Sequence, residues 1–256
     1  MSDVRRLRRA LRHTQGGEQR RTAQSSRPRS QSECIVKWLG RVDYGEALAL
    51  QREWASARTQ GLAEDCLLLL EHPPVITLGR GAKRRHLLAG ENLLRAQGIE
   101  VWEIERGGDV TFHGPGQLVG YPILDLTRHG KDLHRYMRRL EEVLIRTLHG
   151  YGIQGERSAG QTGVWVHGAK IASIGVHVSR WVSRHGFALN VSPDLSAFDL
   201  IMPCGLSGIR MTSMAALLKR QVPVQTVAEA VAVQFALVFD CAVRWRSSPE
   251  AVLSVS

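Results

Sequence analysis

The chain is 256 residues long, with 43% apolar and 23% charged residues, a balance typical of a globular protein that buries a sizeable core. No uninterrupted apolar run approaches the roughly 18 residues of a membrane span. The four cysteines form no C-x-x-C pair and no cluster with histidines, which argues against the usual zinc sites. We therefore expect a soluble cytoplasmic protein that holds no metal and crosses no membrane.

The net charge of +10 is concentrated at the N-terminus. Residues 1–33 hold nine arginines against three acidic residues, a net charge of +6. This composition predicts a disordered Arg-rich tail. The alternatives are an organellar transit peptide and a start codon that was assigned too far upstream. We expect the folded domain at 34–246 and a C-terminal tail at 247–256. Because the charge excess lies in the tail, we expect no nucleic-acid surface, with a basic module that binds RNA as the alternative.

Hydrophobic periodicity and turn residues predict the secondary structure in chain order. The predicted strands lie at 34–39, 66–70, 75–78, 99–104, 118–126, 163–166, 170–178, 186–191 and 241–245. The predicted helices lie at 43–61, 89–97, 132–148, 212–219 and 226–239, and two of them open with capping-box spacing, at 43–46 and 226–229. Helices interrupt the strands irregularly and hairpins are common. This pattern predicts one α/β domain of the α+β type, with a mixed, largely antiparallel sheet flanked by helices.

Two basic segments each allow two interpretations. The turn at 79–85 carries Arg80, Lys83, Arg84 and Arg85, and it either binds an anion or is a solvated loop. The polar face of the helix at 132–148 is rich in arginine, and it either faces solvent or docks an acidic partner.

The stretch from Arg106 to Tyr121 is the most unusual part of the sequence. It contains five glycines and a proline, which exclude a helix and allow backbone to approach a ligand closely. Its polar side chains include Arg106, Thr111 and His113. The glycine spacing fits neither dinucleotide nor P-loop motifs. The stretch is either a backbone-lined binding wall or a glycine-rich turn between two strands with ordinary packed side chains.

Two further residues are candidates for chemistry. Cys204 lies between Pro203 and Gly205 on a predicted turn, where an accessible thiol becomes a nucleophile once a nearby cation favours the thiolate. Lys170 starts an otherwise apolar strand beside a hairpin turn. A partly buried lysine is suited to accept a proton, because burial disfavours its charged form. Each signal is weak alone, since Cys204 also fits an idle loop cysteine and lysines are common on edge strands.

Taken together, the motifs resemble the lipoyl(octanoyl) transferase family. The matching segments follow one another in the order RGGDVTFHGPGQLVGYP at 106–122, GAKIASIG at 168–175, HGFALNV at 185–191 and PCG at 203–205. The resemblance covers roughly residues 37–218. It implies the biotin/lipoate protein ligase-like fold and an ATP-independent acyltransferase that needs no cofactor.

The resemblance also implies substrates and site residues. The family takes an octanoyl or lipoyl group from acyl carrier protein and passes it to a lysine of lipoyl domains in 2-oxoacid dehydrogenases and of the glycine cleavage H protein. The nucleophile then falls on Cys204 and the lysine that tunes it on Lys170. The implied substrate-binding residues are Arg106, Gly107, Gly108, Asp109, Val110, Thr111, Phe112, His113, Ser173, Ile174, Gly175, Gly186, Phe187 and Ala188.

Two other enzyme classes remain as alternatives. An ATP-dependent lipoate or biotin ligase resembles the family in fold but activates a free acid and needs no cysteine. A thiol hydrolase would use Cys204 with His113 or His177 and release free octanoate. We expect His113 to orient the pocket, and we expect apolar side chains such as Phe112, Ile174 and Phe187 to line a slot for the acyl chain.

Overall fold

The computed structural model describes residues 32–202 and 208–246. The predictions for the tails at 1–31 and 247–256, and for Cys204, therefore lie outside the described residues. The first described strand begins at Ser32, two residues before the predicted start of the domain. No helix in the described ranges has the length and apolar character that crossing a membrane requires.

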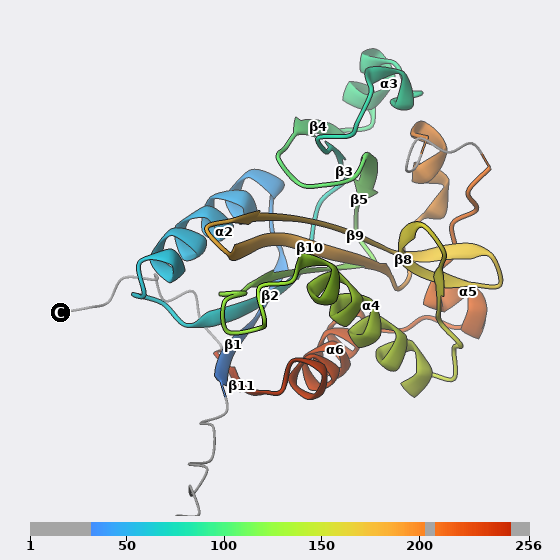
Figure 1. Ribbon diagram of the computed structural model, residues 1–256. Coiled ribbons are helices and arrows are strands. Elements are labelled where there is room, and N and C mark those ends of the chain that lie inside the picture. The colour runs from blue at the N-terminus through green and yellow to red at the C-terminus, as the bar shows by residue number, and fades with distance from the viewer. Residues whose placement is uncertain (1–31, 203–207, 247–256) are drawn as a thin grey trace, which may run out of the picture. The chain divides into compact units, whose positions relative to one another are not determined.

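A mixed sheet of eight strands forms the centre of the fold, and Figure 1 shows it flanked by helices. Its strand order is β11-β1-β2-β6-β10-β9-β8-β7, and only the pairings of β1 with β2 and with β11 are parallel in the described part. The bounds are β1 Ser32–Arg41, β2 Asp65–Glu71, β6 Gln117–Ile123, β7 Glu156–Ser158, β8 Gln161–Val166, β9 Ala169–Ser179, β10 Val182–Asn190 and β11 Cys241–Trp245. The predicted fold class is confirmed, and β11 is the edge strand that the sequence predicted.

Helices cover both faces of this sheet. Helix α2 (Tyr44–Thr59) packs on one face, where Trp54 joins a core with Leu68 and Ile123. Helices α4 (Leu133–Gly150) and α6 (Val224–Phe239) pack together on the other face, over a larger core that includes Phe235 and Leu144. The buried residues of α4 recur at the spacing of one helix face, so its apolar stripe indicates a helix that covers a sheet.

A second, three-stranded sheet contains β3 between β4 and β5. Its strands are β3 Val75–Leu78, β4 Glu100–Glu103 and β5 Val110–His113. The sequence predicted the segments of β3 and β4 as extended but not their separation from the main sheet. The remaining elements are short, namely η1 Arg84–His86, α3 Glu91–Ala96, η2 Leu195–Leu200 and α5 Met214–Leu218. The sequence did not predict η1, η2, β5 or β7.

The helix boundaries agree with the predictions to within two residues, and one of the three predicted caps forms. The Asp132 side chain accepts a hydrogen bond from the Arg135 backbone amide at 3.0 Å, as an N-cap should. Asp43 occupies the N-cap position of α2 but makes no side-chain capping bond, and α6 begins at Val224 after Pro223, before the predicted capping box. The Pro223 carbonyl accepts the first helical hydrogen bond, from the Val227 amide at 3.3 Å, so the helix starts earlier than Thr226.

Tight turns join the antiparallel strands β8, β9 and β10. His167 and Gly168 both have positive φ angles, 49° and 74°, and connect β8 to β9. Arg180 and Trp181, with φ of 49° and 64°, connect β9 to β10. Two consecutive left-handed residues are the geometry of a type I′ hairpin, which matches the twist of the flanking strands. The predicted hairpins are therefore confirmed, and β10 begins four residues earlier than predicted.

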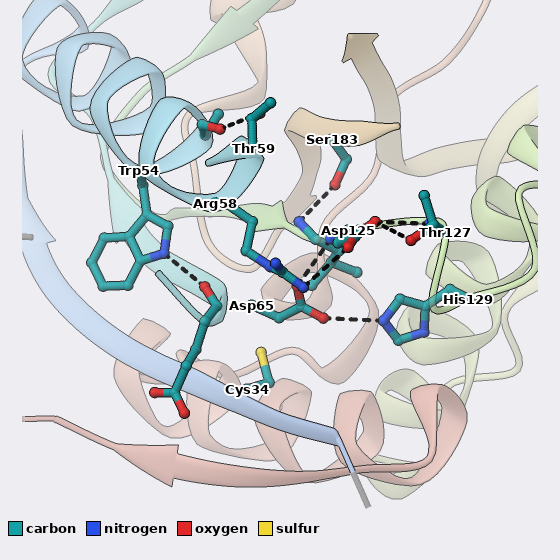
Figure 2. Close-up of polar contacts among 12 residues, drawn as sticks. Cys34, Trp54, Arg58, Thr59, Asp65, Asp125, Thr127, His129 and Ser183 are labelled. Atoms are coloured by element: carbon teal, nitrogen blue, oxygen red, sulfur yellow. Dashed lines mark hydrogen bonds and ion pairs between the residues drawn. The ribbon is translucent and has the colours of Figure 1, made fainter. Parts of the chain in front are cut away.

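A buried ionic network links α2, β2 and the segment after β6, as Figure 2 shows. Asp65 accepts hydrogen bonds from Arg58 Nε at 2.7 Å, the Asp125 amide at 2.9 Å and His129 Nε2 at 3.2 Å. Burial alone raises the pKa of Asp65, but the hydrogen bonds from His129, Asp125 and Arg58 outweigh it and hold the pKa below its usual value. The network therefore requires an ionised carboxylate at the start of β2.

Replacing Asp65 with asparagine leaves the buried Arg58 without its closest negative partner. We expect Asp65→Asn to lower the free energy of unfolding by about 3 kcal/mol, because the positive charge of Arg58 would stay buried without the carboxylate that compensates it. Urea unfolding at neutral pH measures this change. Glu33→Gln, which removes an exposed partner of Arg244, is the matched control and should cost less than about 1 kcal/mol. Equal effects of the two variants would show that the buried network does not stabilise the fold.

Candidate active site

A cavity of about 540 Å³ brings together nearly all of the residues that the sequence nominated. Its lining includes Lys170 and every predicted substrate-binding residue except Phe112. These residues come from β5, β9, β10 and the loop before β5, so chain segments up to about eighty positions apart in the sequence meet at one site. The volume lies in the range of cavities that bind small molecules or acyl groups.

Strand β9 runs along the length of the cavity. Lys170 lies near its start, and Val176 lies six residues further on, where its carbonyl oxygen accepts a hydrogen bond from the Gly107 amide at 2.8 Å. At roughly 3.3 Å per residue, the two positions are about 20 Å apart along the strand. The lysine and the glycine loop at 106–109 therefore mark two separate ends of the site.

The glycine loop approaches β9 closely because the strand carries a glycine where the two meet. A Cβ atom on Gly175 would lie 2.8 Å from the Gly107 carbonyl oxygen and 3.1 Å from Arg106 Cδ. Gly175 pairs with Gly186 on β10, and a Cβ there would collide with the Gly120 carbonyl of β6. The motif glycines therefore allow the loop, β9, β10 and β6 to pack closely, backbone against backbone, beside the cavity.

A second segment fixes the other side of the loop. The amides of Gly79, Arg80 and Gly81 donate hydrogen bonds to the carbonyl oxygens of Asp109, Arg106 and Gly108 at 3.2, 3.0 and 2.9 Å. Within the loop, the buried Arg106 side chain donates from Nη2 to the Thr77 carbonyl at 2.7 Å and to its hydroxyl at 2.9 Å. The basic turn at 79–85 thus borders the cavity, where Arg80 contributes to the lining.

Lys170 is buried at the other end of the site, with 2% of its surface exposed. Its amide donates to the Arg210 carbonyl at 2.8 Å, and its carbonyl accepts from the Thr212 amide at 2.9 Å. The chain that follows the undescribed residues 203–207 therefore returns alongside Lys170. The predicted burial of this lysine on a strand is confirmed.

The structure corrects the prediction for Phe112. Along β5, Thr111 and His113 line the cavity, whereas Phe112 points to the opposite face and packs against Phe198 with ring centroids 5.7 Å apart. Side chains alternate between the two faces of a strand, so a residue between two lining residues faces away. Phe112 therefore belongs to the core beneath the small sheet. Ile174 and Phe187 do line the cavity, as expected.

His113 and its neighbour His72 are held as neutral imidazoles. His113 Nδ1 lies 2.8 Å from Gln117 Oε1, and the Gln117 amide group donates to the Phe112 carbonyl and to Asn190. Since Oε1 only accepts, Nδ1 carries the hydrogen and Nε2 the lone pair. Burial, followed by the nearby His72, lowers the pKa of His113 to about 3. Such a weak base orients the wall of the cavity and takes up no proton near neutral pH.

His72 and His185 extend this buried cluster. His72 Nδ1 donates to the Val42 carbonyl and Nε2 accepts from the Tyr121 hydroxyl, each at 2.7 Å. Burial lowers the pKa of His72 to about 4. Burial also lowers the pKa of His185 to about 3, and Arg184 adds to the shift while Glu105 opposes it.

Several lining residues were not nominated by the sequence. They include Tyr44 at the start of α2, Leu133 and Met137 on α4, and Gly160–Thr162 at the start of β8. Leu133 and Met137 belong to the apolar stripe that predicted α4, but a stripe that faces a cavity has the same period as one that faces the core. Of the titratable lining residues, Arg80, Arg106 and Lys170 are cationic against the single carboxylate of Asp109, so the site favours negative charge.

Comparison with known proteins identifies the family. Residues 43–236 match the model of the lipoyl protein ligase A/B catalytic domain. The chain is 55% identical to an octanoyltransferase of Solibacter usitatus over 207 residues, which cover 81% of this chain and 93% of that protein. It is 49% identical to an octanoyltransferase of Geobacter metallireducens over 206 residues, 80% of this chain and 93% of the relative. The chain belongs to the octanoyltransferase family.

Solved structures with this fold include members outside the octanoyltransferases. A lipoate-protein ligase A bound with ATP superposes with a TM-score of 0.69 at 14% identity, over 86% of this chain and 90% of the other. A bipartite lipoate protein ligase from Thermoplasma acidophilum gives 0.69 at 15% identity, over 86% and 89% of the two chains. These likenesses confirm the ligase-like fold that the motifs predicted.

The three neutral histidines predict how stability depends on pH. An unfolded histidine takes up a proton near pH 6.5, whereas His72, His113 and His185 resist protonation until pH 3 to 4, so the free energy of unfolding falls as the pH falls through this window. Each buried histidine contributes a slope of about 1.4 kcal/mol per pH unit. We expect His113→Asn to reduce the slope between pH 5.5 and 4 by that amount in urea titrations.

His167→Asn is the matched control for this slope. His167 is exposed in the β8–β9 turn, at a left-handed position that asparagine also accepts, so its replacement should leave the slope as in the wild type. An unchanged slope in His113→Asn as well would contradict the neutral, buried state of His113.

Proposed function

We propose that this acyltransferase moves an octanoyl or lipoyl group from acyl carrier protein to a lysine of lipoyl domains, through a thioester on Cys204. The acceptors would be the lipoyl domains of 2-oxoacid dehydrogenases and the glycine cleavage H protein. The observation that carries the proposal is a cavity with a buried lysine, Lys170, at one end, in a chain that is 55% identical to an octanoyltransferase over 81% of its length. A cytoplasmic location remains a prediction from the sequence.

In the first step, the Cys204 thiolate attacks the carbonyl carbon of the carrier thioester. The new carbon–sulfur bond replaces the old one, and the departing carrier thiolate takes a proton from the ammonium of Lys170. One thioester is exchanged for another, so the step is nearly isoenergetic and needs no nucleotide. Lys170 pairs with residues 210–212, so it lies beside the chain that resumes after the undescribed residues 203–207, which supports its assignment to this step.

In the second step, the neutral amine of the acceptor lysine attacks the enzyme thioester. A carbon–nitrogen bond forms, the carbon–sulfur bond breaks, and Lys170 takes the proton that the acceptor nitrogen loses. The enzyme returns to a thiolate beside an ammonium ion, ready for the next carrier. Lys170 thus carries one proton back and forth between the two half-reactions.

The dimensions of the cavity support an acyl chain that runs from Lys170 towards the glycine loop. The seven carbon–carbon bonds of an extended octanoyl group span roughly 9 Å, by the bond lengths that also set the reach of a peptide. This is about half the distance along β9 between Lys170 and Val176. Ile174, Phe187 and Met137 provide apolar lining.

The thiol hydrolase is the weaker alternative. A hydrolase needs a base that activates water, and the pKa of His113, lowered by burial to about 3, makes it a poor base at neutral pH. His177 is not among the residues that line the cavity. Lys170, buried at the end of the cavity, is the better placed proton acceptor.

Intact-protein mass spectrometry tests the proposal, using octanoyl carrier protein and no ATP. We expect the wild type to gain one octanoyl group that hydroxylamine removes, as expected for a thioester. Cys204→Ser should give no hydroxylamine-labile adduct, because an ester replaces the thioester. Lys170→Ala should acquire the group at least tenfold more slowly, because the departing thiolate loses its proton donor.

Addition of a lipoyl domain then separates the transferase from its rivals. Appearance of the octanoyl mass on the lipoyl domain supports transfer, whereas release of free octanoate alone would establish a hydrolase. A requirement for ATP would establish a ligase. An unchanged acylation rate in Lys170→Ala would remove the role of this lysine and leave the Cys204 thioester standing.

A further inference from the structure

The side chain of Lys170 is held by strand β8, which lies beside β9. Lys170 pairs with Trp165 in the register of the two strands, and its Nζ atom lies 5.3 Å from the centroid of the Trp165 ring. Trp165 is itself buried, and it is not among the residues that line the cavity. The ring therefore contacts the ammonium group from the protein interior and not from the cavity.

Gly163 forms the other wall of the space that holds the lysine. A Cβ atom on Gly163 would lie 2.8 Å from Lys170 Cε and 2.5 Å from the Ala172 carbonyl oxygen. Its φ angle of +131° is also a conformation that other residues rarely adopt. Any side chain at this position would push the lysine stem out of its place, so Gly163 and Trp165 together define one position for a chain with four flexible bonds.

A buried carboxylate keeps this part of β8 in place. Glu141 on α4 is almost completely buried and accepts the amide of Gly163 at 3.2 Å. It also binds Arg138 at 2.7 Å and Arg157 at 3.1 Å, which neutralise its charge. This hydrogen bond connects α4 to β8 at Gly163, the residue that packs against the aliphatic part of the Lys170 side chain.

We propose that Trp165 is a positioning residue for the proton transfer that Lys170 performs, an inference that rests on the proposed function. The electron-rich face of an indole ring attracts a cation, and the Trp165 ring lies at the distance from Nζ that this interaction requires. The ring thus stabilises Lys170 when it holds the proton taken from the acceptor amine, and it keeps Nζ in one position between the half-reactions. Transfer to the lipoyl domain is the step that gains the proton and depends most on the ring.

The rate of octanoyl transfer from preloaded enzyme to a lipoyl domain tests this role in single turnovers. We expect Trp165→Leu to lower this rate about tenfold and Trp165→Phe about threefold, because phenylalanine keeps a weaker aromatic face. The amount of acyl enzyme formed from octanoyl carrier protein should remain that of the wild type. The KM for the lipoyl domain should change by less than twofold, since the ring touches no substrate.

A second lysine whose amine lies over a tryptophan ring provides a matched control for the loss of the Trp165 ring. Lys37 Nζ lies 5.1 Å from the centroid of the Trp54 ring, which extends from α2 into the core against the main sheet and does not line the cavity. Trp54→Leu should leave the transfer rate of the folded enzyme within twofold of the wild type. A tenfold loss in Trp54→Leu as well would overturn the proposal, because the effect would then be one of general packing.

A double-mutant cycle with Lys170→Ala decides whether the ring acts through the lysine. We expect Trp165→Leu to cause no further loss in the Lys170→Ala background. An undiminished tenfold loss there, or a wild-type rate in Trp165→Leu alone, would overturn the role of Trp165 while leaving that of Lys170 intact. A Lys170→Ala enzyme that transfers at the wild-type rate would overturn the proposed role of the lysine and this proposal with it.

Discussion

The site depends on the close packing of backbone against backbone at the end of β9. The loop at 106–109 lies between the segment at 79–81 and strand β9, and four amide hydrogen bonds hold it there. This arrangement has no space for a Cβ atom at Gly79 or Gly175. The loop precedes β5 in the small sheet, so the same contacts connect that sheet to the main one. The loop at 106–109 therefore both lines the cavity and connects the two sheets.

The polar groups of the cavity divide into two kinds by their protonation. The buried histidines stay neutral because burial opposes their charged form, and their hydrogen bonds to Gln117, Val42 and Tyr121 are those of neutral rings. Arginine and lysine side chains supply the positive charge instead. The proposed chemistry moves one proton, and Lys170 is the group that carries it. Because the buried histidines around the cavity are weak bases, they do not compete with Lys170 for this proton near neutral pH.

The sequence predicted most elements of the fold and the location of the site, but not how the chain folds around it. Asp132 and the stripe after it marked α4, and the His167-Gly168 turn marked a hairpin, because both signals are local. The separation of β3, β4 and β5 from the main sheet depends on pairing between distant segments, which no local pattern records. Phe112 was placed on the wrong face, because a glycine-rich motif does not indicate which of its side chains point inward.

Gly163 and Trp165 show a different limit. In the sequence they are two residues of an ordinary strand, and neither glycine nor tryptophan is unusual there. Their importance comes from the register between β8 and β9, which places one against the stem and the other against the amine of Lys170. Such a role is visible only once the partner strand is known, whereas Cys204 and Lys170 were candidates from their own neighbours in the chain.

The proposed reaction explains why the structure fixes the positions of a few reactive groups and does not supply many of them. Exchange between thioesters is nearly isoenergetic, and an amide is more stable than the thioester from which it forms, so the enzyme needs no energy source. It must instead hold an acyl chain, a thiol and one amine in fixed relation, because correct orientation supplies much of the rate of such steps. A lysine stem is flexible, and the glycine, the indole ring and the buried Glu141 behind it each remove part of that freedom. The rigidity of β8 is therefore as much a part of the proposed mechanism as the amine itself.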